Sequence, residues 1–429
     1  MTSAPIVVTL VLSALTVLGI GTSSFAQSPA ETLSAPRGLV TEPPSEGLVI
    51  PTPKGHMVAY NQTLPGSEAT IEMVPVPGGV VRISVAPFDA EDATATPEEE
   101  SYIEVELAPY WISRHEITWE AYWQFMQLDA TFTGIEQLRT LSRGPRRSQV
   151  EQTLAQHANL RAAILREPEL CQIDAVTAPT ALYDSSTTYE SGREPNLPAV
   201  SMTPFAAKQF TKWLSRLTGV SYRLPSEAEW QHAAQADAAA EPKDLDAVAW
   251  TIDNSDYVAH PVGQKLPNAW GLHDMLGNVA ELVLDAATPA GRPALSGKRV
   301  DWQTAIAWPE QDYPMQAKGG HYDSELEEIS VTARLVTNPD WKDADPNLPR
   351  SPWWFASYPS NGVGFRLVRP MMPIDAELAS RVWDADTDDV VRAVEDRLRE
   401  GRGKVGWIAP RLPAAARELE TPEVSALLK

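Results

Sequence analysis

The chain has 429 residues, a single cysteine and a formal net charge of −22 at pH 7. With 43% hydrophobic residues it can bury a sizeable core, so the composition excludes a disordered chain. The excess of acids predicts repulsion of nucleic acid, and the lone Cys171 excludes both an intramolecular disulfide and a cysteine-rich metal site.

Residues 1–26 are predicted to be a signal peptide. Positions 5–21 are apolar and uncharged, and Ser24 and Ala26 place small residues before a cleavage point at Gln27. The apolar run is shorter than the ~20 residues that a membrane-spanning helix needs. We therefore expect an exported protein, periplasmic or extracellular, with no stable membrane insertion after cleavage. An uncleaved N-terminal membrane anchor is the alternative.

Residues 27–69 are rich in Pro, Ser, Thr and Gly, which is typical of a linker. The main domain is expected to span 70–370. Its first part predicts strands, because 73–83 has a Pro-Gly-Gly turn between two apolar pieces and 102–111 alternates apolar and polar residues.

Capping residues mark the expected helix starts. These are Thr118, Thr203 followed by Pro204, and Ser226 with Glu229. Ser148 with Glu151 predicts a further helix that is stopped at Pro168. That helix lies within 129–194, which is interpreted as a helical insertion.

The remainder of the chain divides into two parts. Residues 250–370 are dominated by Gly, Asn, Pro, Asp and aromatic residues, which predicts a loop-rich fold with buried tryptophans. Residues 371–429 are expected to form a separate C-terminal tail, in which Thr387 caps a helix that ends at Gly401.

Six short segments, in order along the chain, resemble the formylglycine-generating-enzyme family, whose members are also called sulfatase-modifying factors. The segments are YWISRHEIT at 110–118, LPAVSM at 197–202, YRLPSEAEW at 222–230, NAWGLHDMLGNVAE at 268–281, KGG at 318–320 and NGVGFR at 361–366. The resemblance covers about 70–370 and skips the insertion. It implies the family's α+β fold, which is loop-rich and related to C-type lectin domains.

The resemblance also implies a calcium site. In the family, the positions matching Asp274, Gly277, Val279 and Glu281 bind calcium through two side chains and two backbone carbonyls. Calcium takes six to eight oxygen ligands in a flexible geometry, and this segment offers two carboxylates and a glycine-asparagine turn. We expect a structural calcium ion here. A tight turn with Glu281 paired to an arginine is the alternative.

Two other sets of charged residues are interpreted as structural. Arg223, Glu227 and Glu229 are expected to form an ion-pair network at a helix start. His321 stands where the family has a serine, and it is interpreted as a hydrogen-bonded residue rather than a metal ligand.

The chemistry of the family requires two thiols just after the Gly-Gly pair, which hold copper and the substrate cysteine. Here Ser324 aligns with the first thiol, the second falls between Leu326 and Ile329, and no cysteine lies between Gly320 and Arg369. A serine hydroxyl is hard, stays protonated and cannot exchange disulfides. Copper is therefore not expected.

Three functional hypotheses follow, and no catalytic residue is assigned under any of them. The favoured one is an exported binding or accessory module for an unknown protein or glycan ligand. The second is an enzyme with non-thiol or metal-dependent oxidative chemistry. The third is sulfatase maturation that uses Cys171 from the insertion.

Overall fold

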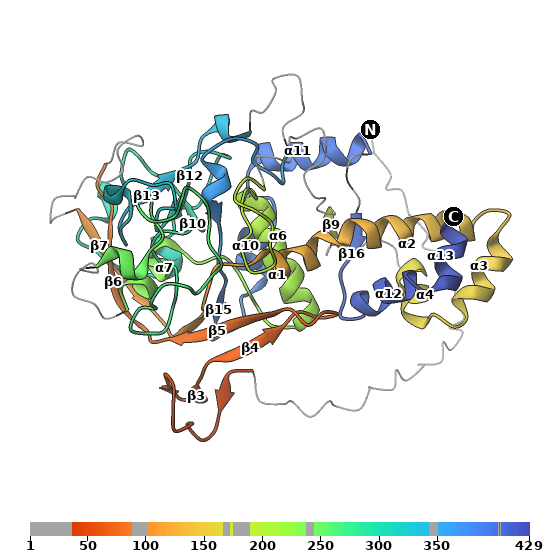
Figure 1. Cartoon of the computed structure of the whole chain (residues 1–429), viewed down its shortest axis with the longest axis horizontal. Coiled ribbons are helices and arrows are strands. Elements are labelled where there is room, and N and C mark those ends of the chain that lie inside the picture. Colours follow the sequence, from red (N-terminus) through yellow and green to blue (C-terminus); the bar gives the residue numbers. More distant parts are fainter. Residues whose placement is uncertain are drawn as a thin grey trace, which may run out of the picture. The chain divides into compact units, whose positions relative to one another are not determined.

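The computed structural model describes residues 37–87, 101–165, 172–174, 189–236, 244–342, 351–401, 403 and 405–429 (Figure 1). The predicted signal peptide at 1–26, the beginning of the linker and Cys171 lie outside the described residues. Residues Gly38–Lys429 form one compact unit. Within the described ranges, no helix is both long and apolar enough to cross a membrane.

The strands are short and belong to several small sheets. Their bounds are β1 (Leu39–Val40), β2 (Ile50–Thr52), β3 (Gly55–Met57), β4 (Tyr60–Thr63), β5 (Thr70–Val76), β6 (Gly79–Ser84), β7 (Tyr102–Leu107), β8 (Tyr110–Ser113), β9 (Gln172–Asp174), β10 (Ala280–Ala286), β11 (Arg299–Asp301), β12 (Met315–Lys318), β13 (Arg334–Val336), β14 (Val363–Gly364), β15 (Val368–Pro370) and β16 (Val405–Trp407).

Two four-stranded sheets bring the sequence motifs together. One has the order β15-β8-β5-β4 and the other the order β13-β12-β10-β14. In the second sheet, Glu281 of β10 pairs antiparallel with Lys318 of β12 and parallel with Gly364 of β14. Three of the six motifs therefore meet side by side on adjacent strands. The other sheets are β1-β3-β2, β11-β7-β6 and β16-β9.

The first eight strands precede the first helix, and helices and strands are interspersed after it. Their bounds are α1 (Trp119–Met126), α2 (Leu128–Ser142), α3 (Arg147–Leu154), α4 (Ala158–Leu165), α6 (Pro204–Thr218), α7 (Glu227–Gln235), α8 (Leu245–Val248), α9 (Trp302–Ala305), α10 (Ala376–Trp383), α11 (Asp388–Arg399), α12 (Leu412–Leu419) and α13 (Pro422–Leu428), with 3-10 turns η1 (Pro293–Leu295), η2 (Leu326–Glu328), η3 (Pro339–Lys342) and η4 (Ser360–Gly362). The mixture confirms the expected α+β class.

Most of the predicted caps are confirmed. The side chains of Thr118, Thr203, Ser226 and Thr387 each accept a hydrogen bond from a backbone N–H in the first turn of α1, α6, α7 and α11. The Ser148–Glu151 capping box is wrong. Helix α3 starts at Arg147 after an N-cap without a side-chain bond, and the expected single helix is split into α3 and α4.

The insertion and the tail pack against each other instead of standing apart. Helices α2, α3 and α4 contact α12 and α13, which Figure 1 shows grouped together. Glu418 of α12 accepts hydrogen bonds from the Asn159 side chain and from the Leu160 backbone N–H, both at 2.7 Å, and so caps α4. A carboxylate at a helix N-terminus is favoured by the helix dipole. The tail is thus an integrated part of the compact unit.

A second set of contacts fixes the start of the tail on α6. The Trp383 indole N–H donates to the Tyr222 carbonyl at 2.8 Å, and Asp384 and Asp386 form ion pairs with Lys212 and Lys208 at 2.6 and 2.9 Å. These lysines are buried, so each of them requires a partner.

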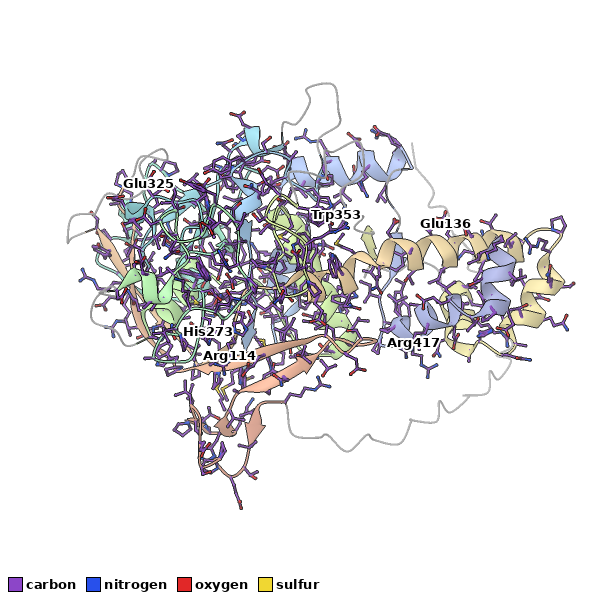
Figure 2. All side chains as sticks on the ribbon, viewed as in Figure 1. Arg114, Glu136, His273, Glu325, Trp353 and Arg417 are labelled. Atoms are coloured by element: carbon purple, nitrogen blue, oxygen red, sulfur yellow. The ribbon has the colours of Figure 1, made fainter. Side chains whose placement is uncertain are left out.

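Aromatic residues fill the core between α1, α6 and the loop-rich segment. The Tyr122 ring lies 5.6 Å from those of Phe125 and Phe210 and 5.8 Å from that of Trp354. Trp353 is buried in the same cluster (Figure 2). The interpretation of the tryptophans of this segment as core residues is confirmed for these two and for Trp341.

Candidate functional site

The buried guanidinium of Arg366 is the point at which the sequence motifs converge. Its Nε and Nη2 each donate to the Glu281 carboxylate at 2.5 Å. The guanidinium also donates to the carbonyls of Ser113 at 2.9 Å and His273 at 3.0 Å, with longer bonds of 3.4 Å to those of Arg114 and Asp274. The Trp230 indole N–H donates to the same carboxylate at 2.6 Å. Both oxygens of Glu281 are therefore already engaged within the protein.

The turn before β10 has an unusual backbone. Asp274, Gly277 and Asn278 have φ angles of 54°, 69° and 54°, in the left-handed region. A Cβ at Gly277 would lie 2.1 Å from the Trp250 carbonyl oxygen, so only glycine fits there. Non-glycine residues in this conformation carry strain that the surrounding structure must offset.

The side chain of Asn278 ties this turn to its surroundings. Its amide nitrogen donates to Oε1 of Glu116 at 3.0 Å, and its oxygen accepts from the His260 N–H at 2.9 Å. Glu116 belongs to the first motif, but the sequence does not reveal its role because its partner is 162 positions away. The same holds for Arg366, because the sequence predicts only an unnamed arginine as the alternative partner of Glu281.

The predicted calcium ligands lie on this one turn and strand. Oδ2 of Asp274 accepts from the Gly263 N–H at 2.6 Å, whereas its buried Oδ1 has no hydrogen-bond partner within the described part of the chain. That orphaned oxygen fits a cation ligand. Glu281 is engaged by Arg366, so it does not offer a free carboxylate. The calcium site therefore stays a prediction.

Backbone oxygens would have to complete such a site. Across the described residues, no group of three or more His, Cys, Asp and Glu side chains is placed to hold a metal ion. Calcium readily accepts carbonyl ligands, and Gly277 and Val279 supply them on the same turn.

Two histidines lie close to this turn, and one of them, His273, directly precedes Asp274. The rings of His115 and His273 lie 5.1 Å apart, and burial lowers the pKa of His115 to about 3. Figure 2 shows His273 next to Arg114, whose side chain donates to the Gly271 carbonyl at 2.6 Å and pairs with Glu72 at 2.7 Å. These contacts hold the loop against β5 and β8.

The acids of the third motif form the expected structural network. Arg223 donates to both oxygens of Glu229, at 2.6 and 2.7 Å, and Glu229 also completes the capping box of α7. Glu227 pairs with Arg334 at 2.7 Å and with the buried Lys318 at 3.3 Å. These acids are committed to fixing α7 against β12 and β13.

The segment that aligns with the family's thiols is also structural. Ser324 is buried, and its hydroxyl accepts from the His321 backbone N–H at 3.2 Å. Ile329 is buried in a small apolar cluster with Ala249 and Leu276. No thiol occurs in the described residues around this segment.

His321 behaves as a hydrogen-bonded core residue. Its Nδ1 accepts from the Asp323 backbone N–H at 3.2 Å, and burial lowers the pKa of its imidazole to about 4. A neutral ring that accepts at Nδ1 carries its proton on Nε2.

Two exposed tyrosines border this segment. Tyr257 is 63% exposed and Tyr358 is 56% exposed. The loop that carries Tyr257 is joined to the segment by a bond of 2.7 Å from the Ser255 hydroxyl to the Tyr322 carbonyl, and the Tyr358 ring lies 6.2 Å from that of His321. Tyr257 is held at a φ of 62°. We call these two exposed tyrosines, which come from two loops next to the segment that aligns with the family's thiols, the aromatic surface.

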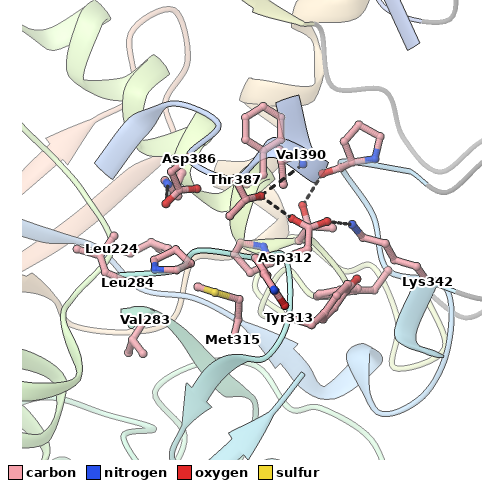
Figure 3. A pocket seen from close by; sticks show the side chains of 18 residues that line it. Leu224, Val283, Leu284, Asp312, Tyr313, Met315, Lys342, Asp386, Thr387 and Val390 are labelled. Carbon is pink, nitrogen blue, oxygen red and sulfur yellow. Dashed lines mark hydrogen bonds and ion pairs between the residues drawn. The ribbon is translucent and has the colours of Figure 1, made fainter. Parts of the chain in front are cut away.

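A separate pocket lies under the start of the tail, between α6, β10 and α11 (Figure 3). It encloses about 520 Å³ including its open mouth, and apolar side chains such as Leu224, Val283 and Met315 line its wall. Its polar groups are paired with one another: Asp312 accepts from Lys342 at 3.2 Å and from Thr387 at 3.1 Å. This pairing links the tail to the domain.

Comparisons with known proteins extend this description. Residues 61–348 match the sequence model of the sulfatase-modifying factor enzyme 1-like domain. The serine/threonine-protein kinase pkn1 of Chlamydia pneumoniae is a relative that is 34% identical to this chain over 117 residues. The match covers 24% of this chain and 17% of the kinase. The chain therefore spans less than a fifth of that protein's length.

Three solved structures are similar over most of this chain. PvdO from Pseudomonas aeruginosa is 22% identical with a TM-score of 0.43, covering 73% of this chain and 98% of PvdO. Treponema denticola variable protein 1 is 17% identical with a TM-score of 0.38, covering 73% and 99%. CarF is 20% identical with a TM-score of 0.36, covering 70% and 99%.

The buried imidazole of His321 predicts a specific loss of stability in acid. Its pKa is about 4 in the folded chain and about 6.5 when unfolded, so the unfolded state binds more protons between these values and the free energy of unfolding falls as the pH falls. Between pH 7 and pH 5 this loss is about 2 kcal/mol. In His321→Asn, which keeps an acceptor, urea unfolding should show a drop smaller by that amount. Parallel pH curves for the two proteins would contradict the assignment.

Proposed function

The chain belongs to the family of the sulfatase-modifying factor enzyme 1-like domain, and on this premise we propose that it is an exported binding or accessory module that does not oxidise thiols. The observation that carries the proposal is the way the thiol positions are filled. Ser324 is a buried hydroxyl that closes a turn, and Ile329 is a buried apolar residue. The family's route needs a thiolate that binds copper and can be displaced, and neither side chain can provide one.

The exposed aromatic surface beside this segment supports a binding role. Tyr257 and Tyr358 are exposed, and the loops that carry them contact residues 321–322. Tyrosine offers a large apolar face and a hydroxyl with few rotatable bonds, which favours contacts with proteins and with sugar rings. The strained backbone of Asp256 and Tyr257, with φ angles of 55° and 62°, supports the same role because strain gathers at functional positions. The proposed ligand is an exported protein or a glycan.

We also propose a structural calcium ion at the turn formed by Asp274, Gly277, Val279 and Glu281. Its support is the orphaned Oδ1 of Asp274, on the same short segment as the backbone carbonyls of Gly277 and Val279, together with the chemistry of calcium, which prefers such oxygens. The ion would neutralise a turn that is otherwise rich in buried carboxylates.

The absence of thiol chemistry can be tested directly. Purified protein with copper and oxygen should not convert a sulfatase peptide containing Cys-x-Pro-x-Arg to formylglycine, as measured by mass spectrometry, because the aligned positions carry no thiolate. Cys171→Ala is the matched control. Turnover lost in this variant would establish the third hypothesis, sulfatase maturation through Cys171. Turnover that survives it would establish non-thiol oxidative chemistry.

The aromatic surface predicts the behaviour of a tyrosine variant. The wild-type protein should bind specific members of a glycan array or of an array of exported proteins from the organism that produces it. Tyr257→Ala combined with Tyr358→Ala should weaken that binding on the order of tenfold or more, because exposed tyrosines are frequent energetic centres of interfaces. Val80→Ala, which truncates an exposed residue on β6, is the control and should bind as the wild type does. Equal binding by all three proteins would place the ligand elsewhere.

A further inference from the structure

Four segments that meet at residues 321–322 carry a concentrated negative charge. They are 189–194, 253–258, 321–328 and 357–362, and together they hold eight acids and one arginine. Their formal charge is −7, compared with −22 for all 429 residues. The acidity of the protein is therefore distributed unevenly, and a large part of it gathers around the aromatic surface.

Contacts to His321 and Tyr322 hold these segments together. The Ser191 hydroxyl donates to the hydroxyl of Tyr322 at 2.8 Å, and the Ser255 hydroxyl donates to the Tyr322 carbonyl at 2.7 Å. The Tyr358 ring lies 6.2 Å from the His321 ring. The acids of four segments that are far apart in sequence thus lie on loops that border one surface.

Most of these acids face solvent without a compensating charge. Asp323 is half-buried, and the other seven are exposed. Within the part of the chain that the structure describes, none of the eight forms an ion pair with a cation. Arg193, the arginine of the first segment, lies over the Tyr189 ring, 6.0 Å from its centroid. A surface of one sign attracts a partner of the opposite sign, and it repels one of the same sign.

Asn361 adds a buried acceptor that lacks a donor. It is 4% exposed, and its Nδ2 donates to the exposed Glu190 at 2.7 Å, whereas its Oδ1 has no hydrogen-bond partner among the described residues. The residue adjoins the same segment, because a Cβ at the following Gly362 would stand 2.7 Å from Cγ of His321. A buried acceptor without a donor indicates a missing partner. Lysine and arginine side chains carry donors only, so they suit both this oxygen and the acids beside it.

We infer that the ligand of the aromatic surface is a cationic polypeptide segment, rich in Lys or Arg, of an exported protein. Its ammonium or guanidinium groups pair with the exposed acids of the four segments and lie over the rings of Tyr257 and Tyr358, since the face of an aromatic ring attracts a cation. A neutral glycan is disfavoured because it leaves these acids without a partner. Recognition depends on charge and requires no cysteine in the ligand. This inference rests on the proposed binding function and narrows its ligand to one class.

The test uses the full chain and a synthetic Arg-Gly repeat peptide, with a Glu-Gly repeat of the same length as the reference, and it measures binding by calorimetry at low and at high salt. The wild type should bind only the Arg-Gly peptide, and its affinity should fall as salt rises, because salt screens exposed charges. Glu325→Gln, Glu327→Gln and Glu328→Gln combined should weaken binding on the order of tenfold or more and reduce the salt dependence. Glutamine keeps the oxygen with which the Glu328 side chain accepts from the Glu325 N–H, so the turn is retained.

A matched variant separates this surface from the general attraction of an acidic protein for a cation. Glu42→Gln, Glu46→Gln and Glu68→Gln combined change the net charge by the same amount at exposed positions outside the four segments. This control should bind the Arg-Gly peptide as the wild type does. Equal weakening in the two triple variants would contradict the inference, because net charge alone would then explain the binding.

The remaining outcomes also decide the matter. If the first triple variant does not fold, Glu327→Lys, at an exposed position, should weaken binding by a comparable factor, and unchanged affinity would overturn the inference. A wild type that does not bind the Arg-Gly peptide would overturn it as well. The proposed binding function fails separately, because it requires arrayed ligands that are lost in Tyr257→Ala combined with Tyr358→Ala. Neutral glycans that behave in this way, and that the acid variant still binds, would leave that function standing without the cationic ligand.

Discussion

The buried pair of Arg366 and Glu281 is the interaction on which the arrangement of the sequence motifs depends. The guanidinium holds a carboxylate on β10 and carbonyls from the end of β8 and from the turn before β10. Trp230 brings α7 to the same carboxylate. A buried charge that loses its partner is strongly destabilising, so these loops must close around the pair together. This central contact joins segments that belong to two different sheets, since Ser113 lies on β8 and Glu281 on β10.

The boundaries of helices can be predicted from the sequence because they depend on neighbouring residues. Contacts between residues that are distant in the sequence cannot be predicted in this way. Thr203 before Pro204 and Ser226 with Glu229 are caps whose partners lie within one turn, so the sequence alone identifies them. Ser148 with Glu151 has the same pattern, but α3 starts two residues earlier than this cap predicts, at Arg147, and its N-cap residue makes no side-chain hydrogen bond. The pairing of Glu116 with Asn278 spans 162 positions, and no local pattern signals it. The tail is predicted to be separate because its contacts with the rest of the chain, such as that of Trp383 with Tyr222, join residues far apart in sequence and leave no local signal.

The same scaffold can serve different functions because chemistry resides in a few positions grafted on it. In this chain the positions that align with reactive thiols belong to a turn and an apolar cluster, through Ser324 and Ile329. The neighbouring surface carries the exposed Tyr257 and Tyr358. The buried acids of the third motif and of the turn at 274–281 hold loops in place. The charges inside this protein therefore organise the fold, and the proposed function lies on its surface.

The central role of the Arg366–Glu281 pair is tested most directly by a double-mutant cycle, in which urea unfolding gives the free energy of unfolding of each variant. Arg366→Met and Glu281→Gln should each lower the free energy of unfolding by roughly 3–5 kcal/mol, because each leaves a buried group without its partner. The double variant should be destabilised by clearly less than the sum of the two, with a coupling energy of about 2 kcal/mol or more. Additive effects, with a coupling energy near zero, would contradict the claim that this pair holds the motifs together.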